Sequence, residues 1–136
     1  MIIPFLRHLE EKLPASGEEL ERFAQLAQYT PRTLAKHDFL LQAGQICQSV
    51  AYIEEGAVLY YRENDNADKQ VCDVLFEGAW ATYINSLTTQ KPSDMYIQAL
   101  EPTRIVEIHR DNLAILYEQF PKLERFSRAI TETSFV

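Results

Sequence analysis

The sequence predicts one mainly β domain flanked by helices, a closed sandwich or barrel. Residues 32–109 form short runs with a two-residue hydrophobic period, bounded by Gly, Asn, Asp and Pro, as strands do. The residues before and after this stretch have the three- and four-residue spacing of helices. A length of 136 residues, 46% hydrophobic and 24% charged, suits one core. We therefore expect N-terminal helices over 1–31, the β unit over 32–109 and C-terminal helices over 110–136, within one domain over 1–136.

Two helices are expected in the N-terminal part. The first covers residues 2–13, and its apolar face carries Phe5, Leu6, Leu9 and Leu13. Ser16-Gly17-Glu18-Glu19 has the form of a capping box, in which the hydroxyl and the carboxylate satisfy free amides at the start of the second helix. That helix buries Leu20, Phe23, Ala24 and Ala27. Thr30-Pro31 ends it, because proline restricts the preceding residue to extended conformations.

The β unit contains about seven predicted strands. They are residues 32–37, 39–42, 50–55, 57–63, 69–76, 95–101 and 103–109. Gly44, Gly56 and Gly78 fall at strand junctions, where a positive φ or a close backbone approach is usual. Residues 77–95, which lie between the strand at 69–76 and the next predicted strand, are expected to form a long loop.

Helical spacing returns after His109, with an apolar face of Leu113, Leu116, Tyr117 and Phe120 and a cap at Asp111 or Asn112. Pro121 suits the first turn of a last helix. That helix places Leu123, Phe126 and Ile130 along one seam. The seam either packs back on the β unit or pairs with a second copy of the chain as a dimer interface.

Composition and motifs exclude several classes of function. No apolar run approaches the roughly 18 residues of a membrane span, and the N-terminus has no secretion signal, so we expect a cytoplasmic protein without membrane contact. The net charge of −7 disfavours direct binding of nucleic acid. Cys47 and Cys72 are expected to be buried thiols. The three histidines are dispersed, so no metal, no cofactor and no enzymatic activity is predicted.

A family resemblance is carried by LLQAGQICQSVAYIEEGAVLYY, by VLFEGAW, by IQALEPTRIVEIHR and by PKLERFSRAI. In this order they resemble the cyclic-nucleotide-binding domain of Crp/Fnr-type transcription regulators, over nearly the whole chain. The resemblance implies a double-stranded β-helix (jelly roll) flanked by helices. It also implies a phosphate-and-ribose cassette in the turn near residue 80, and a last helix that dimerises.

The cassette residues depart from the family pattern, which has Phe-Gly-Glu in the turn and Arg-Ser or Arg-Thr entering the next strand. Alignment on Trp80 and residues 97–101 puts Thr82 at the glycine position and Tyr83 at the glutamate position. Ser93 replaces the arginine, and Asp94 follows. A cation near 4 Å from a phosphate contributes up to about 4 kcal/mol at an effective dielectric near 20. Because this chain lacks the arginine that would supply that cation, cyclic nucleotide binding is not expected. A bulged loop that delivers Lys91 is the alternative.

The candidate ligand-binding residues are therefore Trp80, Thr82, Tyr83, Ser93, Asp94 and Met95. With Tyr96 they allow two interpretations. In one, an aromatic cavity binds an unidentified small-molecule effector. In the other, these side chains fill the core and nothing binds, an interpretation favoured by the frequency of aromatics in cores.

The leading functional prediction is an effector or sensor domain of a Crp/Fnr-like regulator with a degenerate cyclic-nucleotide pocket, working as a homodimer. Such a domain acts on DNA only through a helix-turn-helix domain absent from this chain. The alternative is a freestanding ligand-binding or protein-interaction module without DNA binding, and the third possibility is a small-molecule enzyme.

Overall fold

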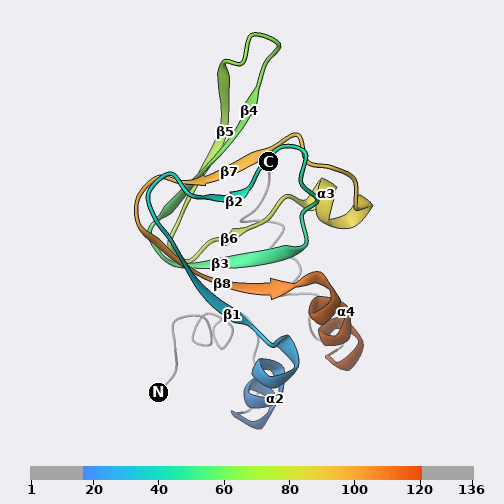
Figure 1. Ribbon diagram of the computed structural model, residues 1–136. Coiled ribbons are helices and arrows are strands. Elements are labelled where there is room, and N and C mark those ends of the chain that lie inside the picture. Colours follow the sequence, from blue (N-terminus) through green and yellow to red (C-terminus); the bar gives the residue numbers. More distant parts are fainter. Residues whose placement is uncertain (1–16, 121–136) are drawn as a thin grey trace.

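The computed structural model describes residues 17–120, which form two antiparallel four-stranded sheets with helices at their margins (Figure 1). The mainly β architecture predicted from the sequence is confirmed. The helices are α2 (Gly17–Ala27), α3 (Ile84–Thr89) and α4 (Arg110–Gln119), and the strands are β1 (Thr30–Leu34), β2 (Phe39–Leu41), β3 (Ser49–Glu55), β4 (Ala57–Glu63), β5 (Lys69–Phe76), β6 (Trp80–Ala81), β7 (Tyr96–Ala99) and β8 (Thr103–His109).

The first sheet has the strand order β1-β8-β3-β6 and the second has the order β2-β7-β4-β5. Strands that are distant in the sequence therefore pair, as Val50 of β3 does with Ile108 of β8. The β4–β5 hairpin projects beyond the rest of the domain (Figure 1). Glycine is required at the turn into β4, because Gly56 has a φ of +108° and lies against Pro102 and Thr103.

Strand β3 of the first sheet is buried on both faces, which explains why it is apolar at successive positions. On β3, Ala51 and Ile53 belong to the core between the sheets, whereas Val50 and Tyr52 belong to a second core beneath α2 and α4. The core between the sheets is formed by Leu34, Leu41, Cys47, Ala51, Ile53, Val58, Tyr60, Ala81, Tyr83, Met95, Ile97, Ala99 and Ile105. The core under the helices is formed by Phe23, Ala27, Val50, Tyr52, Trp80, Val106, Ile108, Leu113 and Leu116.

Helices α2 and α4 lie side by side at the end of β8 (Figure 1). Their contact is fixed by a hydrogen bond from Asn112 Nδ2 to the carbonyl of Leu26 at 3.2 Å. The expected cap of α4 was wrong, because His109 occupies the cap position and its Nδ1 accepts from the backbone N–H of Asp111 at 3.1 Å.

Three boundaries differ from the prediction. Helix α2 ends at Ala27, where Gln28 adopts a φ of +46°, and Thr30-Pro31 already belongs to β1. Strand β1 stops at Leu34, because His37 turns the chain with a φ of +76°. Residues 77–95 are not one loop, since they contain β6 and α3. A two-residue strand and a six-residue helix are too short to show a hydrophobic period.

The predicted helix over residues 2–13, the capping residue Ser16 and the seam of Leu123, Phe126 and Ile130 lie outside the described residues. The division into segments 1–31, 32–109 and 110–136 stays a prediction. Within residues 17–120, no helix has the length and apolarity to cross a membrane.

Candidate functional site

The predicted cassette corresponds to residues 78–95, which run from β6 through α3 to the start of β7 and are called the cassette segment below. Strand β6 pairs with β3 through Ala51 and Ala81. Helix α3 ends at Gln90, which adopts the left-handed conformation with a φ of +58° and donates from its N–H to the carbonyl of Ser86. The segment is thus a short strand, one compact helix and a return arm over residues 91–95.

Trp80 does not join the other candidate residues. Its side chain is fully buried in the core under α2 and α4, at 5.3 Å between ring centroids from Tyr52. Tyr83 and Met95 lie in the core between the sheets. Tyr96 faces away from that core and stacks on Tyr61 at 4.8 Å. Trp80, Tyr83, Met95 and Tyr96 therefore do not surround one cavity, which was the first of the two interpretations.

Thr82 is buried and has polar partners on every side. Its Oγ1 donates to the carbonyl of Ser49 at 2.9 Å and lies 3.3 Å from Cys47 Sγ. Its backbone N–H donates to the hydroxyl of Tyr60 at 2.8 Å, and that hydroxyl donates to the carbonyl of Thr82 at 3.0 Å. Burial raises the pKa of Tyr60 far above its ordinary value. Thr82, at the position that is glycine in the family pattern, therefore connects the cassette segment to β3 and β4 by hydrogen bonds.

Tyr83 and Asp94 come together around a residue that the sequence did not single out, Arg62 of β4. The Tyr83 hydroxyl donates to Asp94 Oδ1 at 2.7 Å, and Arg62 Nε donates to Asp94 Oδ2 at 3.0 Å. Arg62 Nη2 also donates to the Tyr83 hydroxyl oxygen at 3.2 Å. The hydrogen bond from Tyr83, followed by that from Arg62, lowers the pKa of Asp94. These three residues are called the Arg62 network.

Arg62 was missed although a signal for it exists in the sequence. It follows Tyr60 by two positions on β4, so both side chains project from the same face of the strand. Tyr60 reaches Thr82 and Arg62 reaches Tyr83, so the two face the cassette segment in order. Arg62 Nη1 also lies 3.4 Å from Cys72 Sγ. Cys72 is exposed, contrary to the prediction, because β5 is an edge strand of its sheet.

Ser93 and Met95 are held inside the fold. Ser93 Oγ donates to the carbonyl of Met95 at 2.9 Å and accepts from its N–H at 2.8 Å. The Ser93 backbone is tied to the turn after β2, since its N–H donates to Gln45 and its carbonyl accepts from Gly44, both at 2.7 Å. Only 4% of Ser93 is exposed. Lys91, the alternative cation, is exposed, and its carbonyl accepts from Ser86 Oγ at 2.7 Å.

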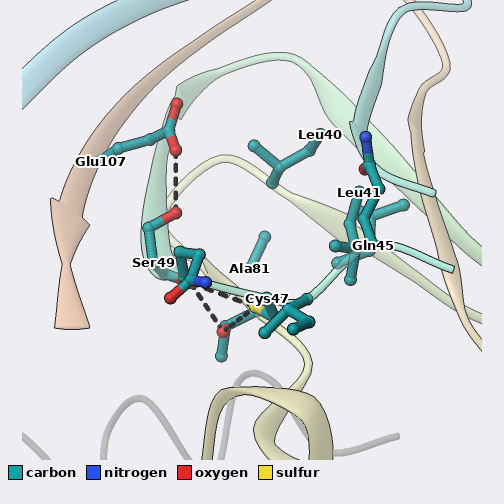
Figure 2. Close-up of a pocket in the computed structure, with 11 residues that line it drawn as sticks. Leu40, Leu41, Gln45, Cys47, Ser49, Ala81 and Glu107 are labelled. Carbon is teal, nitrogen blue, oxygen red and sulfur yellow. Dashed lines mark hydrogen bonds between the residues drawn. The ribbon is translucent and has the colours of Figure 1, made fainter. Parts of the chain in front are cut away.

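A pocket of about 290 Å³ lies on another side of Thr82 (Figure 2). Its apolar wall consists of Leu40, Leu41, Ala81 and Ile97. Its polar wall includes Gln45, Ser49, Thr82 and Glu107. None of the three residues of the Arg62 network lines it, so pocket and network are separate features. Among residues 17–120, no three His, Cys, Asp or Glu side chains gather as a metal site would require.

The cyclic nucleotide-binding domain family matches residues 31–120, from β1 to the end of α4. The chain belongs to this family. The two sheets, the flanking helices and the position of the cassette segment are those of this class of domain. A search of curated proteins found no match.

Solved structures share the fold at low sequence identity. The Thermus thermophilus catabolite activator protein aligns with a TM-score of 0.74 and 17% identity, over 92% of this chain and 57% of that chain. A cyclic nucleotide-binding domain from Methylobacillus flagellatus aligns with a TM-score of 0.73 and 21% identity, over 93% and 78%. The N-terminal domain of a transcriptional regulator from Streptomyces coelicolor gives 0.68 and 16%, over 92% and 86%. The chain therefore spans little more than half the length of the catabolite activator protein.

Proposed function

We propose that this chain is the regulatory domain of a Crp/Fnr-like transcription regulator, and that its cyclic nucleotide site is closed by the protein's own side chains. The observation that carries the proposal is the burial of Tyr83, Ser93 and Met95, with the Arg62 network beside them. A cyclic nucleotide would need a cation where Ser93 stands, and the nearby guanidinium of Arg62 is already paired with Asp94 at 3.0 Å.

The closure comes more from packing than from the ion pair. Arg62 and Asp94 are 36% and 66% exposed, and an exposed pair contributes only about 0.2–1 kcal/mol, which a bound phosphate could outcompete. Tyr83 and Met95, in contrast, are buried in the core between the sheets. Making room for a ribose and a phosphate would expose these side chains and break the Ser93 hydrogen bonds. The carboxylate of Asp94 therefore acts within a paired network, since it accepts from both Tyr83 and Arg62.

The regulatory mechanism in this proposal is a population shift. A ligand or partner protein that prefers one arrangement of the C-terminal helices would pass that bias to a DNA-binding domain beyond Val136. The predicted seam of Leu123, Phe126 and Ile130 would pair two copies, and the assembly would work in the cytoplasm. In this role the domain has no catalytic activity and no cofactor.

A second candidate is a protein-interaction module of the same fold without DNA binding. The closed cassette favours it, because a domain that takes no nucleotide has no need to transmit nucleotide binding to DNA. Reading the coding sequence past Val136 separates the two candidates. A helix-turn-helix in the same frame supports the regulator, and an immediate stop codon supports the module.

The cassette is tested by thermal unfolding of the chain with cyclic AMP and with cyclic GMP. A specific ligand at a hundred times its dissociation constant adds about 2.7 kcal/mol of stability, whereas we expect no change in melting temperature. Asp94→Ala is the informative companion, because it frees Arg62 without adding a cation and should also give no change. A saturable response of the unmodified chain to micromolar nucleotide would refute the closed site.

A further inference from the structure

The pocket beside Thr82 has a shape that suits a small molecule. It is formed between the two sheets where β2, β3, β6, β7 and β8 approach one another, and its volume of about 290 Å³ falls at the lower end for ligand sites. Leu40, Leu41, Ala81 and Ile97 give it an apolar wall that suits a short alkyl chain. Figure 2 shows Leu40 and Leu41 across the pocket from Glu107.

The polar wall is dominated by Glu107. Its position on β8 directs the carboxylate to the same face as Ile105, which lies in the core between the sheets. Oε2 accepts from Ser49 Oγ at 2.8 Å and Oε1 accepts from Arg32 Nη1 at 3.1 Å (Figure 2 draws the first bond). A carboxylate has about four acceptor positions, so these two bonds leave capacity for a further donor.

The charge of the pocket selects among ligands. The eleven residues that line it carry one carboxylate and no Lys or Arg side chain, in a chain of net charge −7. An anionic ligand would meet the carboxylate of Glu107, whose paired cation, Arg32, does not line the pocket. A protonated amine would instead form a charge-assisted hydrogen bond in a site that is partly shielded from water, since the Glu107 side chain is only 21% exposed.

We propose that this pocket binds a small primary amine with a short apolar body, whose ammonium group bonds to Glu107 and whose chain lies against Leu41, Ala81 and Ile97. The site is distinct from the Arg62 network, none of whose residues lines it, although Ala81 and Thr82 of the cassette segment do. Binding here would not require opening the cassette segment.

An occupant of the pocket would contact the cassette segment directly at Ala81 and Thr82 and would be linked to α3 through Cys47. Cys47, which lines the pocket, donates from its N–H to Ser86 Oγ at 2.9 Å and accepts at its carbonyl from Gln90 Nε2 at 3.2 Å. Ser86 belongs to α3, and Gln90 caps that helix. A regulatory role of the bound amine rests on the proposed function of the domain, whereas the binding itself does not.

The test uses three probes with one apolar body: pentylamine, pentan-1-ol and pentanoate at millimolar concentration and neutral pH. Binding to the complete chain is followed by ¹⁵N–¹H correlation spectra. We expect saturable shifts at the amides of Cys47, Ser49 and Ala81, with the amine binding at least about tenfold more tightly than the alcohol. Pentanoate should be the weakest of the three. Equal affinities, or shifts elsewhere in the chain, would overturn the proposal.

Glu107→Gln removes the charge with little change of shape and should lose the preference for amine over alcohol. Glu55→Gln is the matched control, because Glu55 also pairs with an arginine between β3 and β8, at 2.9 Å from Arg104, but does not line the pocket. Amine preference retained in Glu107→Gln would contradict the assignment. Nucleotide titration remains a separate measurement, so failure of this site and failure of the closed cassette are distinguishable.

Discussion

The hydroxyl of Tyr60 is bonded to both backbone polar groups of Thr82: it accepts from the N–H at 2.8 Å and donates to the carbonyl at 3.0 Å. One side chain of β4 thereby fixes the residue at which β6 leaves its sheet. Because Tyr60 is fully buried, the deeper end of the cassette segment is joined to the second sheet inside the core.

Tyr60→Phe should therefore destabilise the protein by about 1–3 kcal/mol, since it leaves the N–H and the carbonyl of Thr82 buried without their partner. Urea unfolding of both proteins measures the difference. Tyr117→Phe on α4 is the control, because Tyr117 is 42% exposed, and its effect should stay within about 0.5 kcal/mol. Equal effects of the two substitutions would contradict the role of the buried hydroxyl.

Alkaline pH should affect the same residue. Burial raises the pKa of Tyr60 above the ordinary 10.0, so the folded state keeps the hydroxyl protonated where the unfolded chain ionises. This contribution is complete below pH 10 and is lost as the pH rises above it. The stability of Tyr60→Phe should therefore fall less steeply above pH 10 than that of the unmodified protein, as followed by urea midpoints. Parallel curves would disprove the linkage.

Gly56 and Gly44 make a matched pair for backbone substitution. Both have positive φ, +108° and +93°, but a Cβ on Gly56 would lie 2.8 Å from the Cα of Thr103, whereas one on Gly44 meets nothing within 4 Å. Gly44→Ala should cost about 1 kcal/mol from the backbone alone. Gly56→Ala should cost more than about 2 kcal/mol, because backbone atoms must also move. Thermal unfolding compares them, and similar losses would show that Pro102 and Thr103 yield easily.

Asp94→Asn tests the Arg62 network through its pH dependence. Because the pKa of Asp94 lies below the usual 3.8, the carboxylate stabilises the folded state above that pH, and this contribution disappears as the pH falls below it. At pH 6 the variant should be less stable by a few tenths of a kcal/mol, since Asp94 is largely exposed. The difference should shrink toward pH 3 in urea unfolding. Asp65→Asn in the β4–β5 turn shows the effect of removing one charge outside the network.

Ser93→Arg should not restore nucleotide binding, although it supplies the residue type of the family pattern. The side chain would enter a site that is 96% buried in the present packing and is bonded to the backbone of Met95. We expect a loss of about 2–4 kcal/mol and no melting-temperature response to cyclic AMP. Lys91→Arg, an exposed change on the same return arm, should leave stability within about 0.5 kcal/mol. A gain of cyclic AMP binding would show that the arm opens readily.

The sequence predicts those parts of the fold that depend on local patterns. The two-residue period located β3, β4, β5 and β8, and the apolar spacing of Phe23 and Ala27 located the buried face of α2. Gly56 has the positive φ expected at a strand junction. Local patterns were sufficient here because each of these elements is long enough for its period to repeat.

The candidate site depended on contacts between distant parts of the chain, which periodicity does not report. Arg62 is 32 positions from Asp94 in the sequence, and their contact makes Asp94 a paired carboxylate. Trp80 was grouped with Tyr83 because the family pattern places both in the cassette, yet the fold places them in two different cores. Glu107 appeared as an ordinary strand residue, and only the approach of β2, β3 and β6 gives it a pocket.

The paired backbone bonds between residues 44–45 and Ser93 carry a kinetic consequence. The amide hydrogens of Gly44 and Ser93 can exchange with solvent only when the two segments separate from each other. Both amides should therefore exchange with deuterium through one common opening event. The turn after β2 and the return arm of the cassette segment would then behave as a single cooperative unit of the domain, although about fifty residues of chain lie between them.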